Sequence, residues 1–234
     1  MSALRSALSS ARLSWAEPAQ AVLFDLDGTL ADTAGDLVGA VNHLRVQRGM
    51  PPLPLEVLRP YASSGARGLI GAALDIHPGH AEFEGLRTAF LEAYEGCLSD
   101  TTTLFDGVLE LLSTLEAQGI IWGVVTNKPH RFTVPVMQGL KLMARSATVI
   151  SGDTTAHAKP HPLPLLTACE RIGVPPARVL YVGDDLRDIQ SAQAAHMPSA
   201  AAGWGYIGHS GEIETWGASV IAAQPLDLLL HLGR

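Results

Sequence analysis

The stretch AVLFDLDGTLADT, residues 21–33, decides the fold of this chain. Its four apolar residues predict a buried strand, and that strand ends at two carboxylates, Asp25 and Asp27. Because side chains alternate along a strand, both carboxylates face the same side. Two carboxylates in one small site repel each other until a cation or a proton intervenes, so the pair points to chemistry. Taken alone, the stretch also fits a solvated Asp-Gly turn.

Further strands and helices alternate along the rest of the sequence. Buried strands are predicted over 120–125, 148–150 and 179–182, with a weaker one over 199–202. Helical spacing of apolar residues covers 108–118, 132–140, 163–172 and 186–195. This alternation predicts an α/β fold with a doubly wound parallel sheet, whose ligands bind at the carboxyl ends of the strands.

One gap between strands is too long for a simple connection. Asp25 and Thr126, at the ends of the first two strands, are 101 positions apart, whereas a βαβ unit takes about 30 residues. Roughly 70 residues are therefore inserted, and their helical periodicity predicts a small helical cap domain over 34–104. The core then comprises 19–33 and 105–234, preceded by an N-terminal extension over 1–18.

Three more polar signals follow the later strands in order. They are Thr126-Asn127, Lys159 and the run Gly183-Asp184-Asp185-Leu186-Arg187-Asp188. The loops after parallel strands converge on one rim of the sheet. Carboxylates for Mg²⁺, a lysine and fixed donors are what a phosphoryl group requires. Each signal alone has a structural alternative, such as a strand end, a loop cation or a helix cap.

Composition excludes several classes of function. The chain is 47% hydrophobic and carries a formal charge of -7, which argues against disorder and against a nucleic-acid partner. No apolar run has the roughly 18 residues of a membrane span. Two distant cysteines, Cys97 and Cys169, suit a reducing compartment, so we expect a cytoplasmic monomer or homodimer.

These motifs together resemble those of the haloacid dehalogenase superfamily. DLDGTLADT, from residue 25 to residue 33, is similar to its first motif, and Thr126, Lys159 and GDDLRD match its other three. The resemblance implies a Rossmann-like core with a helical cap inserted after the first motif. It also implies a Mg²⁺-dependent phosphatase acting on a small phosphorylated metabolite. An Asp two residues after the nucleophile is typical of the phosphatases and phosphomutases of the superfamily.

The resemblance implies a catalytic role for four residues. Asp25 is the nucleophile that forms a phosphoaspartyl enzyme, and Asp27 protonates the leaving oxygen and then activates water. Lys159 neutralises charge, while Thr126 binds phosphate oxygens together with the amide of Asn127.

The resemblance also implies a metal site. Its ligands are the Asp25 carboxylate, the Asp27 carbonyl and Asp184, with Asp188 in contact directly or through water. Asp185 stands where a helix begins and is interpreted as its cap.

Substrate choice should lie in the cap. The segment over 63–68 resembles the cap loop of the phosphoglycolate phosphatase group, and Arg67 is our candidate for binding a substrate anion, although a surface role fits equally. The stretches IIWGVVTNKPHRF, VGDDLRDIQSA and WGYI resemble the N-acetylmuramic acid 6-phosphate phosphatases of cell-wall recycling more closely. Both substrates carry a carboxylate, so Arg67 does not separate them. A phosphomutase and a non-catalytic phosphometabolite-binding regulator remain alternatives.

Overall fold

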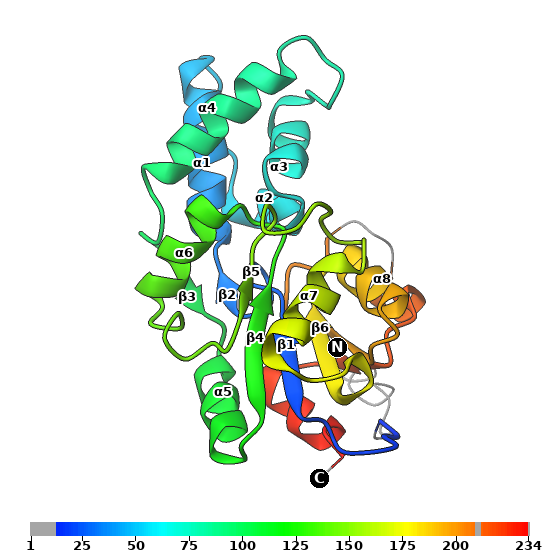
Figure 1. The fold of residues 1–234 in the computed structure, drawn as a ribbon. Helices are drawn as coiled ribbons and strands as arrows, with labels where there is room; N and C mark the ends of the chain where they lie inside the picture. Colours follow the sequence, from blue (N-terminus) through cyan, green and yellow to red (C-terminus); the bar gives the residue numbers. More distant parts are fainter. Residues whose placement is uncertain (1–12, 209–211, 234) are drawn as a thin grey trace, which may run out of the picture.

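A six-stranded parallel sheet forms the centre of the molecule, with helices on both faces and a group of helices beyond one end of it (Figure 1). The computed structural model describes residues 13–208 and 212–233. Residues 1–12 of the predicted N-terminal extension lie outside the described residues. None of the helices within the described ranges is long and apolar enough to cross a bilayer.

The strand order confirms the doubly wound sheet. It runs β5-β4-β1-β6-β7-β8, and every neighbouring pair is parallel. The chain moves outward from β1 through β4 to β5 and then returns to place β6 on the other side of β1. This reversal puts the topological switch point between β1 and β6, where open α/β sheets bind ligands. The strands are β1 (Ala21–Phe24), β4 (Ile121–Val125), β5 (Val149–Ile150), β6 (Val179–Gly183), β7 (Ser199–Ala202) and β8 (Val220–Ala222).

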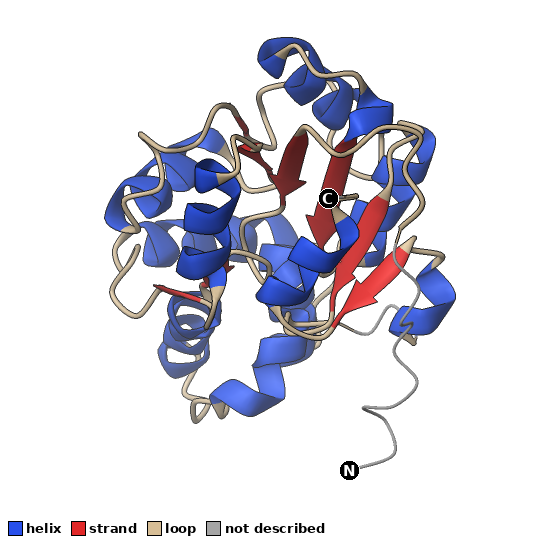
Figure 2. Cartoon of the chain, turned by 90° about the horizontal axis from the view of Figure 1, so that it is seen from below, coloured by secondary structure: helices blue, strands red, loops and turns tan. Residues whose placement is uncertain are grey.

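Helices cover both faces of the sheet (Figure 2). Val22 and Phe24 of β1 point to the face that α5, α6 and the short helix η5 cover. Ala21 and Leu23 point to the other face, under α7 and α8. Because both faces are buried, the strands consist of nearly continuous apolar residues instead of alternating ones. The covering helices are α5 (Val108–Ala117), α6 (His130–Gly139), α7 (Leu163–Ile172), α8 (Leu186–Ala194) and η5 (Pro225–His231), and two single turns, η3 (Pro176–Arg178) and η4 (Ile213–Trp216), join later elements.

The predicted helical insert between the first two core strands is confirmed. We call its elements, α1 through α4, the cap. Side chains such as Val41, Leu69 and Phe90 give the cap an apolar core of its own. It stands beyond the carboxyl ends of the strands (Figure 1). The elements are α1 (Ala34–Gln47), α2 (Leu55–Leu58), η2 (Arg59–Ser64), α3 (Gly65–Leu74) and α4 (Phe83–Glu95).

A short antiparallel ribbon joins the two chain crossings between core and cap. Strand β2 (Ala31–Asp32) leads into α1, and β3 (Thr103–Leu104) returns the chain to the core. The buried Asp36 carboxylate accepts hydrogen bonds from Thr101 and Thr102, which ties the returning chain to the start of α1. The domain limits at 34 and 104 stay a prediction.

Candidate active site

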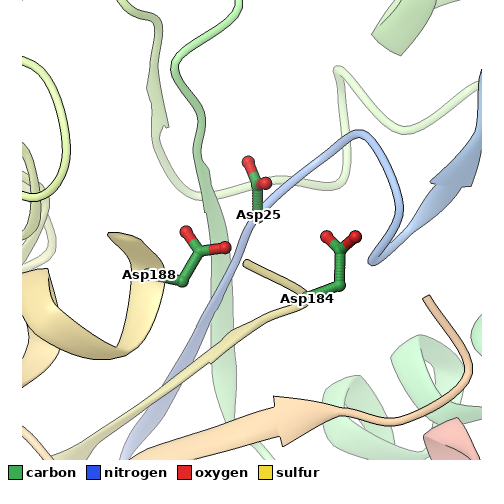
Figure 3. Close-up of side chains that lie close together, drawn as sticks. All are labelled: Asp25, Asp184 and Asp188. Atoms are coloured by element: carbon green, nitrogen blue, oxygen red, sulfur yellow. The ribbon is translucent and has the colours of Figure 1, made fainter. Parts of the chain in front are cut away.

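Three buried carboxylates meet at the switch point of the sheet. Asp25 follows β1, Asp184 follows β6, and Asp188 lies in the first turn of α8. One carboxylate oxygen from each lies within 4.8 Å of the others. Figure 3 shows the three side chains, from three different elements, converging on one space. The order of strands in the sheet thus brings together residues that are up to 163 positions apart in the sequence.

Lys159 supplies a positive charge to this cluster. Its Nζ lies 2.9 Å from Asp25 Oδ1 and 2.6 Å from Asp188 Oδ1, and it donates to the Tyr181 hydroxyl at 2.8 Å. The lysine is 5% exposed, so these partners replace its water. One lysine still leaves the cluster with an excess of negative charge.

Burial and the excess negative charge raise the pKa values of two carboxylates in the cluster. Burial, with repulsion from Asp188 and Asp27 added, raises the pKa of Asp25 to about 6 despite the opposing effect of Lys159. Burial and the charges of Asp25 and Asp188 also raise the pKa of Asp184 well above its ordinary value. Such a site favours either protons or a cation.

The donor set fits a divalent cation. Asp25 Oδ1 is buried and accepts no hydrogen bond of good geometry, although Lys159 is close. Asp184 Oδ2 accepts from Ser63 Oγ and from the Tyr206 amide, whereas the one donor to its Oδ1 among the described residues is Thr29. An oxygen of Asp25 and one of Asp184 therefore keep a free lone pair, and carboxylate oxygens are the ligands that Mg²⁺ prefers.

Gly28 shapes the turn that follows the first strand. Its φ is +86°, a region that side chains disfavour, and a Cβ there would lie 2.2 Å from Asp184 Oδ2. Only glycine lets this backbone pass so close to the carboxylate. The glycine of the first motif is thus required by both its conformation and its neighbour.

Asp27 lies apart from the triad but lines the same cavity as Asp25. Its Oδ1 accepts from Thr33 Oγ1 at 2.6 Å and from Lys128 Nζ at 2.9 Å. Sequence reasoning did not single out Lys128, which is 8% exposed. The feature of the sequence that could have identified Lys128 is its position two residues after Thr126, on the rim where the loops converge.

Thr126 and Asn127 lie next to the lysine loop. Thr126 is buried at the end of β4 and lines the cavity. The Asn127 side chain accepts from the Lys159 amide and donates to the Lys159 carbonyl, both at 2.9 Å. This reciprocal pair fixes the loop that carries the lysine.

Asp185 caps α8, as predicted, and does not join the triad. Its side chain accepts from the Arg187 amide, while the Asp188 side chain accepts from the Asp185 amide, which completes a capping box. Arg187 forms an ion pair with Asp185 at 2.8 Å and donates to the Ser63 carbonyl at 2.8 Å.

The cap closes over the site. Ser63 Oγ, from η2, donates to Asp184 Oδ2 at 2.7 Å, a contact that sequence reasoning missed. Beneath the cap is a cavity of about 290 Å³, which three arginines line, Arg67, Arg87 and Arg187. The candidate residues that line it are Asp25, Asp27, Thr126, Asn127, Lys159 and Asp188. Arg67 is exposed and has no hydrogen-bond or ion-pair partner among the described residues.

Comparison with known proteins identifies the family. The model of the haloacid dehalogenase-like hydrolases matches residues 22–202. The chain belongs to this family. The superfamily resemblance seen in the motifs of this hydrolase is therefore confirmed, and the match spans the motifs from Asp25 to Asp188.

Relatives of this hydrolase fall into the two expected groups. The chain is 43% identical over 215 residues to the N-acetylmuramic acid 6-phosphate phosphatase of Pseudomonas aeruginosa, covering 92% of this chain and 95% of the relative. It is 46% identical over 209 residues to the phosphoglycolate phosphatase of Xanthomonas campestris pv. campestris, with 89% and 94% covered. Since both identities are alike, they do not separate the two groups.

Solved structures agree with the fold of this hydrolase. The crystal structure of a predicted phosphoglycolate phosphatase from Haemophilus somnus has a TM-score of 0.79 and 28% identity, covering 90% of this chain and 96% of that one. The Rossmann-like core and the inserted cap are thus features of the family.

Proposed function

We propose that this hydrolase is a Mg²⁺-dependent phosphomonoesterase that works through a phosphoaspartyl intermediate. One observation carries the proposal: Asp25 lies in a buried carboxylate triad beside Lys159, while Asp27 faces the same cavity. A nucleophile, an acid/base and a charge-neutralising group around one cavity are the parts that phosphoryl transfer needs.

Each residue then has a defined task. Asp25 attacks phosphorus as Asp27 gives its proton to the leaving oxygen. Asp27, now a carboxylate, takes a proton from the water that attacks the phosphoaspartate and releases inorganic phosphate. In both halves of the reaction the phosphate oxygens are bound by Thr126, the Asn127 amide and Lys159.

The carboxylates that fit a cation would hold Mg²⁺. Asp25, Asp184 and the Asp27 carbonyl would contact the ion, and Asp188 would contact it directly or through water. When bound, the ion supplies positive charge that offsets the charges of the phosphate and of the carboxylates.

For the substrate we propose N-acetylmuramic acid 6-phosphate or 2-phosphoglycolate, the compounds named in its relatives. Arg67 is free to bind the carboxylate that both carry. Ser64, Arg67 and Arg187 also border a second, more open depression of about 590 Å³. This continuation leaves room for a leaving group of sugar size and favours the muramate ester.

Phosphate release in the presence of Mg²⁺ tests the proposal. We expect turnover of both esters, and a kcat/KM preference of about tenfold, or ~1.4 kcal/mol, would name the preferred one. Asp25→Asn is the matched control, because it keeps the shape of the side chain and removes the nucleophile. It should lower turnover by about 10³-fold or more.

Two outcomes would contradict this function. An isomerised sugar phosphate in place of free phosphate would support the phosphomutase alternative, and the absence of turnover of these esters and of common sugar phosphates would favour the non-catalytic regulator. We also propose that the enzyme acts in the cytoplasm, where Cys97 and Cys169, both free thiols, would stay reduced.

A further inference from the structure

Lys128 is a buried cation that the reaction described above does not use. Its side chain is 6% exposed, yet it lines the cavity at the boundary between core and cap. A lysine without water requires compensation from charged or polar neighbours. The groups that Lys128 contacts must therefore compensate for the water that it has lost.

Lys128 contacts one group on each side of that boundary. Its Nζ donates to Asp27 Oδ1 of the core at 2.9 Å and to the Tyr94 hydroxyl of cap helix α4 at 2.6 Å. The ammonium also lies 4.6 Å from the centre of the Tyr94 ring, in cation–π geometry. Burial lowers the pKa of Lys128, but Asp27 and Tyr94 outweigh it and the net pKa is raised. The lysine is thus a permanent cation that joins cap to core.

The surroundings of Lys128 and Tyr94 are hydrogen-bonded and closely packed. The Lys128 carbonyl accepts from Thr133 Oγ1 and from the Gly152 amide, which fixes its backbone. The Tyr94 ring packs against Phe132, with ring centres 5.4 Å apart, and stacks on Phe90. Neither partner is a mobile surface group, so the distance between them reports the position of the cap.

Both donors to Asp27 act on the same oxygen. Thr33 Oγ1 and Lys128 Nζ bind Oδ1, and Oδ2 has no hydrogen-bond partner among the described residues. Thr33 stands directly before α1, at the entrance to the cap. Two hydrogen bonds on one oxygen fix the rotation of the carboxylate and leave the other oxygen for proton transfer.

We propose that Lys128, held by Tyr94, is a positioning residue that aims Asp27 Oδ2 at the leaving oxygen when the cap is closed. This inference rests on the proposed function. As the bond from Asp25 to phosphorus forms and the ester P–O bond breaks, the proton on Oδ2 passes to the leaving oxygen. Asp27 becomes a carboxylate whose Oδ1 stays bound to Lys128.

Dependence on the leaving group tests this role. An alkyl phosphate needs its leaving oxygen protonated, whereas p-nitrophenyl phosphate leaves as a stable anion and does not. General acid catalysis contributes about 10²- to 10⁴-fold. We therefore expect Lys128→Met to lower kcat/KM for the alkyl ester by about 10²-fold and to change that for the aryl ester by less than about threefold.

Tyr94→Phe is the second variant. It removes only the hydroxyl and keeps the ring that packs on Phe132, so it preserves the fold of the cap. We expect a loss of about fivefold to tenfold, the size of one hydrogen bond, again confined to the alkyl ester. Asp27→Asn sets the full size of the effect, and Lys141→Met, which changes an exposed lysine, is the matched control.

Equal losses on both esters, or no loss in either variant, would overturn the inference. If Lys128→Met does not fold by circular dichroism, Tyr94→Phe decides alone. Absence of phosphate release by the wild-type protein from both esters is a different result. It would refute the proposed function, and the inference that rests on it would fall too.

Discussion

At the scale of single residues, the two carboxylates with proposed catalytic roles, Asp25 and Asp27, each lie beside a different lysine. Asp25 lies 2.9 Å from Lys159 and Asp27 lies 2.9 Å from Lys128. The two pairs differ in what else is present. Asp25 shares its lysine with Asp188 and repels Asp184, whereas Asp27 is the one carboxylate paired with Lys128 in the described part of the chain. In the proposed function, metal binding and acid/base work would thereby fall to different groups of charges.

Asp25 should make Mg²⁺ binding depend on pH. Its pKa in the metal-free protein is about 6, against a usual 3.8, because burial disfavours the charged form. Between these two pKa values the folded protein holds a proton that the unfolded chain has lost. The contribution of Asp25 to the stability of the fold is therefore fully present below about pH 4 and is lost as the pH rises through 6. Mg²⁺ must displace this proton, so titration calorimetry should show about tenfold weaker binding at pH 5 than at pH 7.

Asp188→Asn provides the control for this titration. It removes one carboxylate that repels Asp25 and should shift the transition toward lower pH. Equal Mg²⁺ affinity at both pH values in the wild-type protein would show that the Asp25 proton does not compete with the ion.

Sequence reasoning predicted a site residue only where its position after a predicted strand and the chemistry of its side chain both indicated a site. Four candidate residues each follow a strand that was predicted from its apolar residues, so their convergence was predictable. They are Asp25, Thr126, Lys159 and Asp184. Lys128 was not predictable, because a lysine after a strand is normally solvated, and its burial comes from cap residues such as Tyr94 that lie far away in the sequence. Sequence spacing does not show which cap side chains reach the core.

At the scale of elements, the start of α8 connects helix formation to the site. The capping box uses Asp188 Oδ2 for the helix and leaves Oδ1 for Lys159. Arg187, the residue directly before Asp188, reaches the Ser63 carbonyl of the cap. The same few residues begin the helix, orient a triad carboxylate and contact the cap.

Removing the cap residue of α8 should be costly. Asp185→Ala deletes the acceptor for the Arg187 amide and the partner of its guanidinium, so we expect the free energy of unfolding to fall by about 1 to 2 kcal/mol in urea titrations. Asp185→Asn keeps an acceptor at the helix start and should lose less. If the two variants were equally stable, the capping hydrogen bond would have no measurable role.

Most of the strands that sequence patterns predicted have strong apolar runs, and the weaker run over 199–202 also forms a strand, β7. Strands β1 and β6 are continuous and buried, and both lie where expected. Strand β8 has three residues and the ribbon strands β2 and β3 have two each, too few to show a period. Strand β5 is as short, with two residues, but it lies within the apolar run predicted over 148–150. The pairing of these short strands comes from neighbours that the fold brings alongside, such as β7 for β8.

At the scale of the whole molecule, cap and core meet around an anionic site. Ser63 binds Asp184 from above, Arg187 binds the Ser63 carbonyl from below, and Tyr94 binds Lys128. These contacts hold the site closed, while the carboxylates beneath them repel one another. A bound cation should therefore stabilise the entire chain.

Chelation should reverse this stabilisation. Exhaustive treatment with EDTA should abolish phosphate release and lower Tm, and added Mg²⁺ should restore both. At an Mg²⁺ concentration of 100 times Kd the gain is about 2.7 kcal/mol. Asp184→Asn is the control, because it removes the triad member that follows β6 and should show no Mg²⁺-dependent Tm shift. Activity that survives chelation would refute the proposed metal site.

The β2–β3 ribbon has a consequence for how such proteins diversify. Asp32 pairs with Thr103, so the roughly 70 residues between them leave and re-enter the core at adjacent points. Any folded segment whose own ends lie close together meets the same geometric requirement. The ribbon would therefore allow the inserted segment, in which we propose that substrate choice lies, to be exchanged in evolution or by design without disturbing the strands of the core.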